Sequence, residues 1–126
     1  MSGLKPKHPG GEILRPRDPV CLVTQDMPAV CLRLHGHRQR IALPYALLLR
    51  IELAEDETAC DITFATHVVN VRGQHLGLIY LSVSQARAAQ VGVGDSASLT
   101  EGESYLGPLV TGMRIEPTDE AGRVRR

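Results

Sequence analysis

The chain has 126 residues, a length that suits one domain with one hydrophobic core. Only 3% of its residues are aromatic and Trp is absent, so the core must be mainly aliphatic, which argues against a base-stacking aromatic platform. The formal net charge is zero, but residues 1–50 hold eight Lys or Arg against three Asp or Glu, whereas residues 51–126 hold six against eleven. Such a separation of charge can direct association with a partner or with copies of the chain.

No part of the chain is expected to enter a membrane or to be secreted. The longest apolar run, residues 41–49, contains Pro44 and is well short of the ~20 apolar residues that a membrane-spanning helix needs. The N-terminus carries prolines and glycines where a secretory signal has an apolar segment. The three cysteines, Cys21, Cys31 and Cys60, are too few for a disulfide framework, and their odd number fits free thiols in a reducing compartment. We therefore expect a small soluble protein of the cytoplasm.

Both ends of the chain differ in composition from its middle. Residues 1–19 are rich in proline, glycine and charged residues and poor in apolar ones, which is typical of a flexible arm. Residues 117–126 have a similar composition and are expected to form a disordered tail. The folded region is then a single domain spanning residues 20–116.

The first part of this region has the two-residue periodicity of half-buried strands. Val30, Leu32 and Leu34 alternate with other side chains until Gly36 interrupts the pattern. A second alternation ends at Pro44, which cannot donate to a central ladder and therefore indicates an edge strand or a bend.

Further strands are expected along the rest of the region. Residues 47–53 fit either a buried strand or a short helix. This element is expected to end at the acidic segment 55–58, which is typical of a solvated loop. Residues 61–72 are rich in β-branched side chains, which predicts one or two strands ending at Gly73. Short strands are expected at residues 96–100 and 109–115, separated by a turn at residues 101–104.

Between residues 76 and 91 the period changes from that of a strand to that of a helix. Five side chains share one face at helical spacing: Leu76, Ile79, Tyr80, Val83 and Ala86. Gly92 then supplies a C-terminal stop. A competing interpretation places a strand at residues 78–82 and begins a shorter helix at Ser84. We prefer the long helix.

The predicted helix has a second apolar side, formed by Leu78, Leu81, Ala88 and Ala89. Either other copies of the chain cover this side in a homo-oligomer, or the sheet and loops of the same chain cover it. The whole pattern predicts an α+β fold. Its architecture is a small antiparallel sheet or a partly closed β-barrel of five to seven short strands, with one principal helix at about residues 76–91.

The chain also shows a weak internal similarity. Shifting it by about 38 residues pairs Ile41 with Ile79 and Leu43 with Leu81, which fits either a duplicated unit or chance matches between aliphatic residues. Residues 77–82, followed by 86–89 and by the Gly94-Asp95 pair, resemble the strand, short helix and turn of cradle-loop barrels, which include AbrB-like regulators and double-psi barrels. Ser82 stands where the AbrB-like pattern usually has a proline. Residues 64–76 are similar to uncharacterised bacterial proteins, a resemblance that implies no activity.

The densest polar cluster is a candidate site for an anionic partner. Arg33, His35, His37, Arg38 and Arg40 lie on and after a predicted strand, where a turn would present several cations together. Arginine at such a tip can contact the phosphates of nucleic acid. Against this stand a pI near 7.0 and the lack of a recognisable nucleic-acid-binding motif. The alternative is a solvated hairpin end.

Other polar residues make weaker candidates. Cys31, His35 and His37 could ligate zinc, with a fourth ligand from Cys60, His67 or His75, but no recognised metal-binding spacing is present. Cys60 and Asp61 are adjacent, so on a strand they point to opposite faces and cannot cooperate in catalysis, with or without His67. We expect no metal, no cofactor and no catalytic residues.

These observations predict a non-enzymatic binding or assembly module that self-associates, making it a homo-oligomer. The alternative is a nucleic-acid-binding regulator that uses the basic hairpin tip. An enzyme with no recognisable motif is a third hypothesis.

Overall fold

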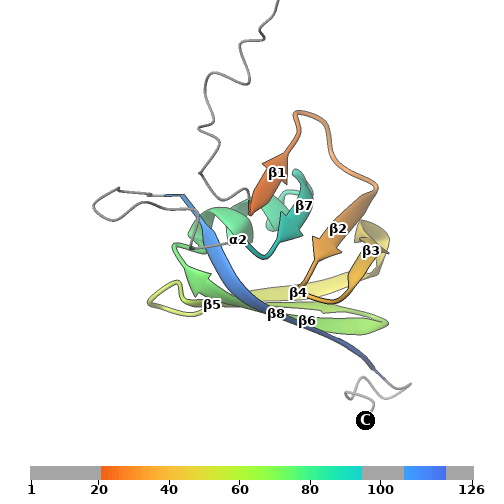
Figure 1. The fold of residues 1–126 in the computed structure, drawn as a ribbon. Helices are drawn as coiled ribbons and strands as arrows, with labels where there is room; N and C mark the ends of the chain where they lie inside the picture. The colour runs from red at the N-terminus through yellow and green to blue at the C-terminus, as the bar shows by residue number, and fades with distance from the viewer. Residues whose placement is uncertain (1–20, 95–106, 119–126) are drawn as a thin grey trace, which may run out of the picture.

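The computed structural model describes residues 21–94 and 107–118, which form eight strands, one α-helix and one 3-10 helix (Figure 1). The α+β class predicted from the sequence is confirmed. The strands form two four-stranded sheets and no closed barrel within this part of the chain, so the barrel variant is wrong. The eight strands of the described residues exceed the expected five to seven.

The first sheet has the strand order β1-β7-β2-β3, with β1 at Leu22–Thr24, β7 at Ala88–Gly92, β2 at Cys31–His35 and β3 at Arg40–Pro44. The second sheet has the order β4-β5-β6-β8, with β4 at Leu48–Leu53, β5 at Ala59–Phe64, β6 at His67–Gln74 and β8 at Leu109–Pro117. The 3-10 helix η1, Tyr45–Leu47, links β3 to β4 and so carries the chain from one sheet to the other. Pairing is antiparallel except between β2 and β7, which run parallel.

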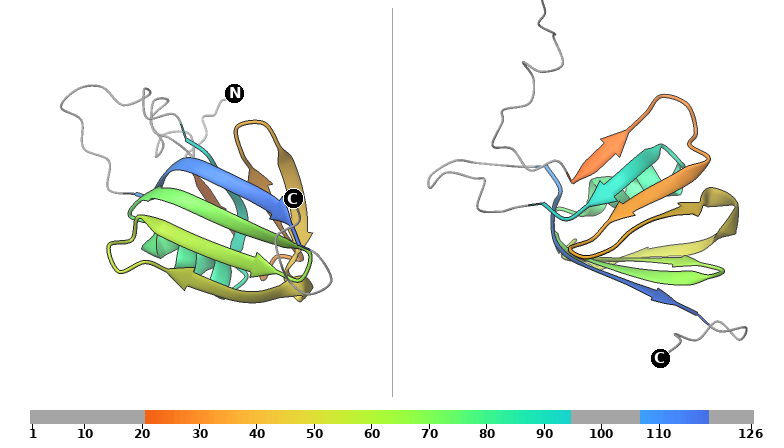
Figure 2. Two further views of the ribbon diagram at one scale, coloured as in Figure 1. Left: turned by 90° about the horizontal axis from the view of Figure 1, so that it is seen from below. Right: turned by 45° about the vertical axis from the view of Figure 1, so that its right-hand side comes forward.

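The core lies between the two sheets, which Figure 2 shows one above the other. Each strand directs alternate side chains inward, so that Leu32 and Leu34 of β2 are fully buried, as are Ile62 and Phe64 of β5. The helix α2, Gly77–Ser84, contacts both β4 and β7 and adds buried Ile79 and Val83 to this core. The expected aliphatic core is therefore present, with Phe64 as its largest member.

Most predicted strands form where expected. The segment 47–53 becomes the strand β4, the segment 61–72 becomes the β5–β6 hairpin, and β3 is an edge strand that ends at Pro44. Val30 is an exception, because β2 begins only at Cys31 and Val30 is 82% exposed. Its carbonyl accepts a hydrogen bond from the amide of Tyr45 (2.9 Å), which holds this residue in the bend before the strand.

The helix is shorter than the long helix that the sequence predicts, and it lies before the position that the competing interpretation gives it. It ends at Ser84, and Ala88–Gly92 is the strand β7, so neither a helix over residues 76–91 nor a strand at residues 78–82 is correct. Gly92, expected to stop the helix, lies in β7. The true stop is at Ala86, where the backbone turns left-handed with φ of 57°.

Two hydrogen bonds close this end of the helix in the arrangement of a Schellman motif. The amide of Ala86 donates to the carbonyl of Val83 (3.0 Å), and the amide of Arg87 donates to the carbonyl of Ser82 (2.8 Å). Glycine usually occupies the left-handed position because any other L-residue is strained there. Alanine at this position is why the sequence gives no stop signal here.

The other end of α2 is held by the loop between β4 and β5. The backbone carbonyl of Glu57 accepts from the amide of Leu76 (3.0 Å), and its carboxylate accepts from the amide of Gly77 (3.2 Å). A Cβ atom on Gly77 would lie 2.8 Å from that carboxylate, so any larger residue at position 77 would displace the Glu57 side chain. The acidic segment 55–58 is thus more than a solvated loop, because Glu57 anchors the helix to the second sheet.

Other expectations have mixed outcomes. The 38-residue repeat is not realised in the structure, since Ile41 and Leu43 lie in β3 while Ile79 and Leu81 lie in α2. The folded region continues past residue 116, because Thr118 is buried and its amide donates to Thr66 (2.9 Å). The expected arm at 1–19, the strand at 96–100, the turn at 101–104 and the tail beyond residue 118 lie outside the described residues. Within the described parts, no helix is both long and apolar enough to cross a membrane.

The turn at Ala86 leads to a stability prediction. Replacing Ala86 with glycine relieves the left-handed strain, and we expect the free energy of unfolding to rise by about 0.5–1 kcal/mol after glycine's own entropic cost. Urea denaturation followed by circular dichroism measures this change. Ala42→Gly, in the exposed edge strand β3, is the control and should lower stability. If Ala86→Gly lowers it as well, the left-handed turn is not the constraint inferred here.

Candidate functional site

The predicted basic cluster does lie on a hairpin. The amide of Gly36 donates to the carbonyl of Gln39 (2.8 Å) and closes the turn between β2 and β3, with His35 opposite Arg40 in the register. Leu32 and Leu34 point into the core, so Arg33 and His35 point to the outer face of the first sheet. The structure therefore brings Arg33, His35 and Arg40 together on that face.

The environment of His35 reflects its arginine neighbours. Burial lowers its pKa, and the charges of Arg40 and Arg33 lower it further. Arg33 also donates from Nε to the Gln90 side chain on the neighbouring strand β7 (3.5 Å). This surface is positively charged, and the histidine on it favours its neutral form.

The remaining two members of the cluster lie elsewhere on the hairpin. His37 leans toward the second sheet, where its Nε2 is 3.3 Å from the carbonyl oxygen of Thr111 in β8. Arg38 is exposed at the tip. The five residues thus do not form one patch, because the turn directs His37 away from Arg33, His35 and Arg40.

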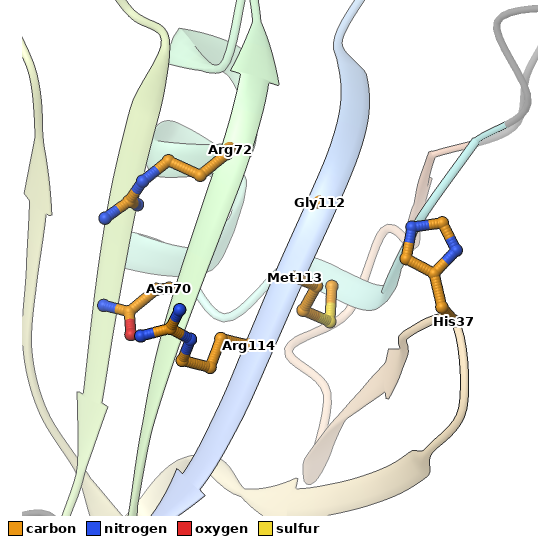
Figure 3. A pocket seen from close by; sticks show the side chains of 6 residues that line it. All are labelled: His37, Asn70, Arg72, Gly112, Met113 and Arg114. Atoms are coloured by element: carbon orange, nitrogen blue, oxygen red, sulfur yellow. The ribbon is translucent and has the colours of Figure 1, made fainter.

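A groove runs along β8 where the hairpin tip approaches the second sheet (Figure 3). It has a volume of about 380 Å³ and is lined by His37, Asn70, Arg72, Gly112, Met113 and Arg114. Asn70 and Arg72 lie on the outer face of β6, paired with Arg114 and Gly112 of β8. Figure 3 shows Asn70, Arg72 and Arg114 on one side of β8 and His37 on the other. Sequence reasoning missed all of these residues except His37, because only the β6–β8 register brings them together.

One carboxylate organises the polar side of the groove. Asp61, on the outer face of β5, accepts hydrogen bonds from Asn70 Nδ2 (3.0 Å) and Arg72 Nη1 (2.9 Å). Burial by itself raises the pKa of Asp61, but hydrogen bonds from Asn70 and Arg72 and the charge of Arg72 outweigh it, so this pKa is lowered. Arg72 is therefore held in place and its charge is balanced.

Arg114 differs from Arg72 in this respect. Within the described residues its guanidinium forms no hydrogen bond or ion pair, and its side chain is exposed. Figure 3 shows it extending from β8 over β6 toward Asn70. An arginine that is not paired with a carboxylate can bind an anionic ligand in the neighbouring groove through charge-assisted hydrogen bonds.

The proposed interface residues divide into two groups. Leu78 and Leu81 are 50% and 48% exposed on α2, and Tyr80 beside them is 37% exposed. Ala88 and Ala89 lie in β7 and are buried, so their assignment to an exposed helix face is wrong. The reason is the early end of the helix at Ala86. We call Leu78, Tyr80 and Leu81 the outer face of α2.

The residues considered for metal binding and catalysis are dispersed. Within residues 21–94 and 107–118, no three His, Cys, Asp or Glu side chains gather closely enough to hold a metal ion. Cys60 points into the core, and burial raises its pKa to about 12, so its thiol is a poor nucleophile. Asp61 lies on the opposite face of the same strand, as the alternation predicts.

No family model, curated protein or solved structure matches this chain. The resemblance to cradle-loop barrels rested on a strand followed by a helix at residues 77–89. The structure has the reverse order there, a helix followed by a strand. Function must therefore be argued from the surfaces themselves.

Asp61 provides a test of how the groove is organised. Because its pKa is lowered in the folded state, its stabilising effect is present above the unfolded pKa and is lost as the pH falls through the folded value. We expect Asp61→Asn to reduce the free energy of unfolding at neutral pH by up to about 1 kcal/mol, since the pair is partly exposed. The difference from wild type should shrink below about pH 4.

Urea unfolding of both proteins at about pH 7, 5 and 3 measures this dependence. Asp26→Asn is the matched control, because Asp26 is an exposed carboxylate on the connection between β1 and β2. A difference that stays constant down to the lowest pH would show that the charge of Asp61 does not hold Arg72.

Proposed function

We propose that this chain is a non-enzymatic binding module that assembles with copies of itself through the outer face of α2. One observation carries the proposal: an eight-residue helix presents Leu78, Tyr80 and Leu81 to solvent while its other side is fully buried. Single exposed leucines are ordinary on protein surfaces, but neighbouring ones on one helix make an apolar patch that association would remove from water.

The rigidity of α2 supports this role. Glu57 holds its first turn and the Schellman motif at Ala86 closes its last, so the outer face of α2 is presented by a fixed element. A preorganised surface loses little conformational entropy when a partner binds.

The three unpaired cysteines further support a reducing compartment, and we include the cytoplasm in the proposal.

Self-association is tested by introducing a charge into the patch. Leu78→Glu and Leu81→Glu should each weaken assembly by roughly tenfold or more, because a carboxylate would be buried at the interface. Multi-angle light scattering at tens of micromolar protein measures the mass of each variant. Ala42→Glu, which adds the same charge at an exposed position of β3, should leave the mass unchanged. A wild-type protein that is monomeric in this range overturns the proposal.

A second candidate is a regulator that binds nucleic acid through the hairpin. It is favoured by Arg33, Arg38 and Arg40, none of which forms an ion pair within the described residues. Arg33 and Arg40 share the outer face of the first sheet and Arg38 lies at the adjoining tip, which suits contacts with successive phosphates. The scarcity of aromatic side chains favours contacts with phosphates over base stacking.

Salt dependence distinguishes this second candidate. We expect a labelled DNA duplex to bind at low salt, and Arg38→Ala combined with Arg40→Ala to reduce the slope of log K against log salt by about two. Fluorescence anisotropy measures the binding. Arg87→Ala, at an exposed arginine between α2 and β7, is the control and should leave the slope unchanged. Absence of binding at low salt would contradict the hypothesis that the hairpin binds nucleic acid.

A further inference from the structure

We propose that the groove along β8 is a binding site for the carboxylate group of a small organic acid. Arg114 would bind the carboxylate, and the rest of the ligand would lie over Gly112 toward Met113. The groove volume of about 380 Å³ is at the lower end of the ~300–1,000 Å³ typical of small-molecule sites. It therefore suits a ligand of a few heavy atoms.

The charges around the groove favour a monoanion. Its lining includes two arginines, Arg72 and Arg114, and the charge of Arg72 is already balanced by Asp61 at 2.9 Å. Among the two arginines that line the groove, only Arg114 is left without a carboxylate partner; the exposed Arg38 lines an adjoining hollow. A carboxylate carries one negative charge and matches the planar fork of a guanidinium, which can donate two parallel hydrogen bonds to it. A phosphate dianion would leave a surplus negative charge close to Asp61.

The floor of the groove is open because residue 112 is glycine. A Cβ atom there would meet only the Cβ of Arg72, at 3.9 Å, which is ordinary van der Waals contact. The backbone of Gly112 is not in the left-handed region, so a side chain fits at this position without strain. The missing side chain is what leaves space between Arg72 and His37. Neither folding of the strand nor packing of the core requires a glycine here.

His37 forms the opposite wall of the groove. Its ring is held 3.3 Å from the carbonyl oxygen of Thr111, so the hairpin tip is joined to β8 beside Gly112. The turn of the hairpin thereby covers one side of a surface that would otherwise be the plain outer face of a sheet edge. The site needs both sheets, and it shares no residue with the outer face of α2.

The site is tested by NMR titration of the full chain with butyrate, a monocarboxylate with a short apolar tail. Butyrate should bind saturably with a Kd of about 1 mM, given its six heavy atoms, and should shift the amide signals of Gly112, Met113 and Arg114. Inorganic phosphate at the same ionic strength should bind at least several-fold more weakly. Tighter binding of phosphate would overturn the assignment of ligand class.

Three variants locate the binding. Arg114→Gln should weaken butyrate binding by about tenfold because it removes the uncompensated charge. Gly112→Val should abolish binding by filling the groove, while its amide spectrum stays that of a folded protein. Arg50→Gln, on the exposed edge strand β4 and paired with Glu52, should bind butyrate like wild type. Unchanged binding by Gly112→Val, or equal loss in Arg50→Gln, would overturn the site.

An additional ligand distinguishes the two sources of a carboxylate. Acetyl-glutamate amide mimics an acidic side chain of a partner protein, and it should bind more weakly than butyrate if the groove takes a free small acid. Stronger binding of the glutamate mimic would show that the groove binds an acidic side chain of a partner protein and not a free small acid. Because α2 is not involved, the result is independent of whether the chain self-associates.

Discussion

The left-handed turn at Ala86 is the constraint on which the two-sheet architecture depends. It stops α2 after Ser84 and reverses the chain, so that Ala88–Gly92 can form β7. That strand is one of the two inner strands of the first sheet, paired antiparallel with β1 and parallel with β2. Had the helix continued to residue 91, β1 would have no partner and the β2–β3 hairpin would stand alone. The buried side chains of Ala88 and Val91 would then lie on a helix instead of closing the core.

The sequence predicts the strands better than it predicts this turn, for a physical reason. Strands such as β2 and β5 alternate buried and exposed side chains, and alternation is a local property of the sequence. The apolar residues after Ala86 suit a helix and a buried strand equally well, and alanine is a strong helix former. Besides the local hydrogen bonds of the Schellman motif, residues far away along the chain hold the turn. The amides of Ala29 and Gln25 donate to the carbonyls of Ala86 (2.7 Å) and Arg87 (3.0 Å). Tertiary hydrogen bonds thus override the local preference.

The candidate sites show the same division between local and distant information. Arg33 and His35 could be grouped from the sequence because residues two apart on a strand share a face. The separation of His37 from them depends on the conformation of the turn, and the pairing of Asn70 with Arg114 depends on a register between distant strands. A single sequence contains no direct signal for that register. The early end of α2 likewise separated Leu78 and Leu81 from Ala88 and Ala89, which the longer helix would have placed together.

The surfaces that remain exposed lie on different parts of one rigid framework. Glu57 ties α2 to the loop between β4 and β5, and Asp61, in the strand that follows this loop, holds Arg72 beside the groove. The β5 strand and the loop before it therefore link α2 to the second sheet, which carries the groove. Because β5 is an inner strand paired on both sides, Asp61 and the loop that carries Glu57 are both joined to the second sheet. A ligand in the groove and a second copy on α2 would therefore bind to a preformed scaffold, which allows both to be bound at once.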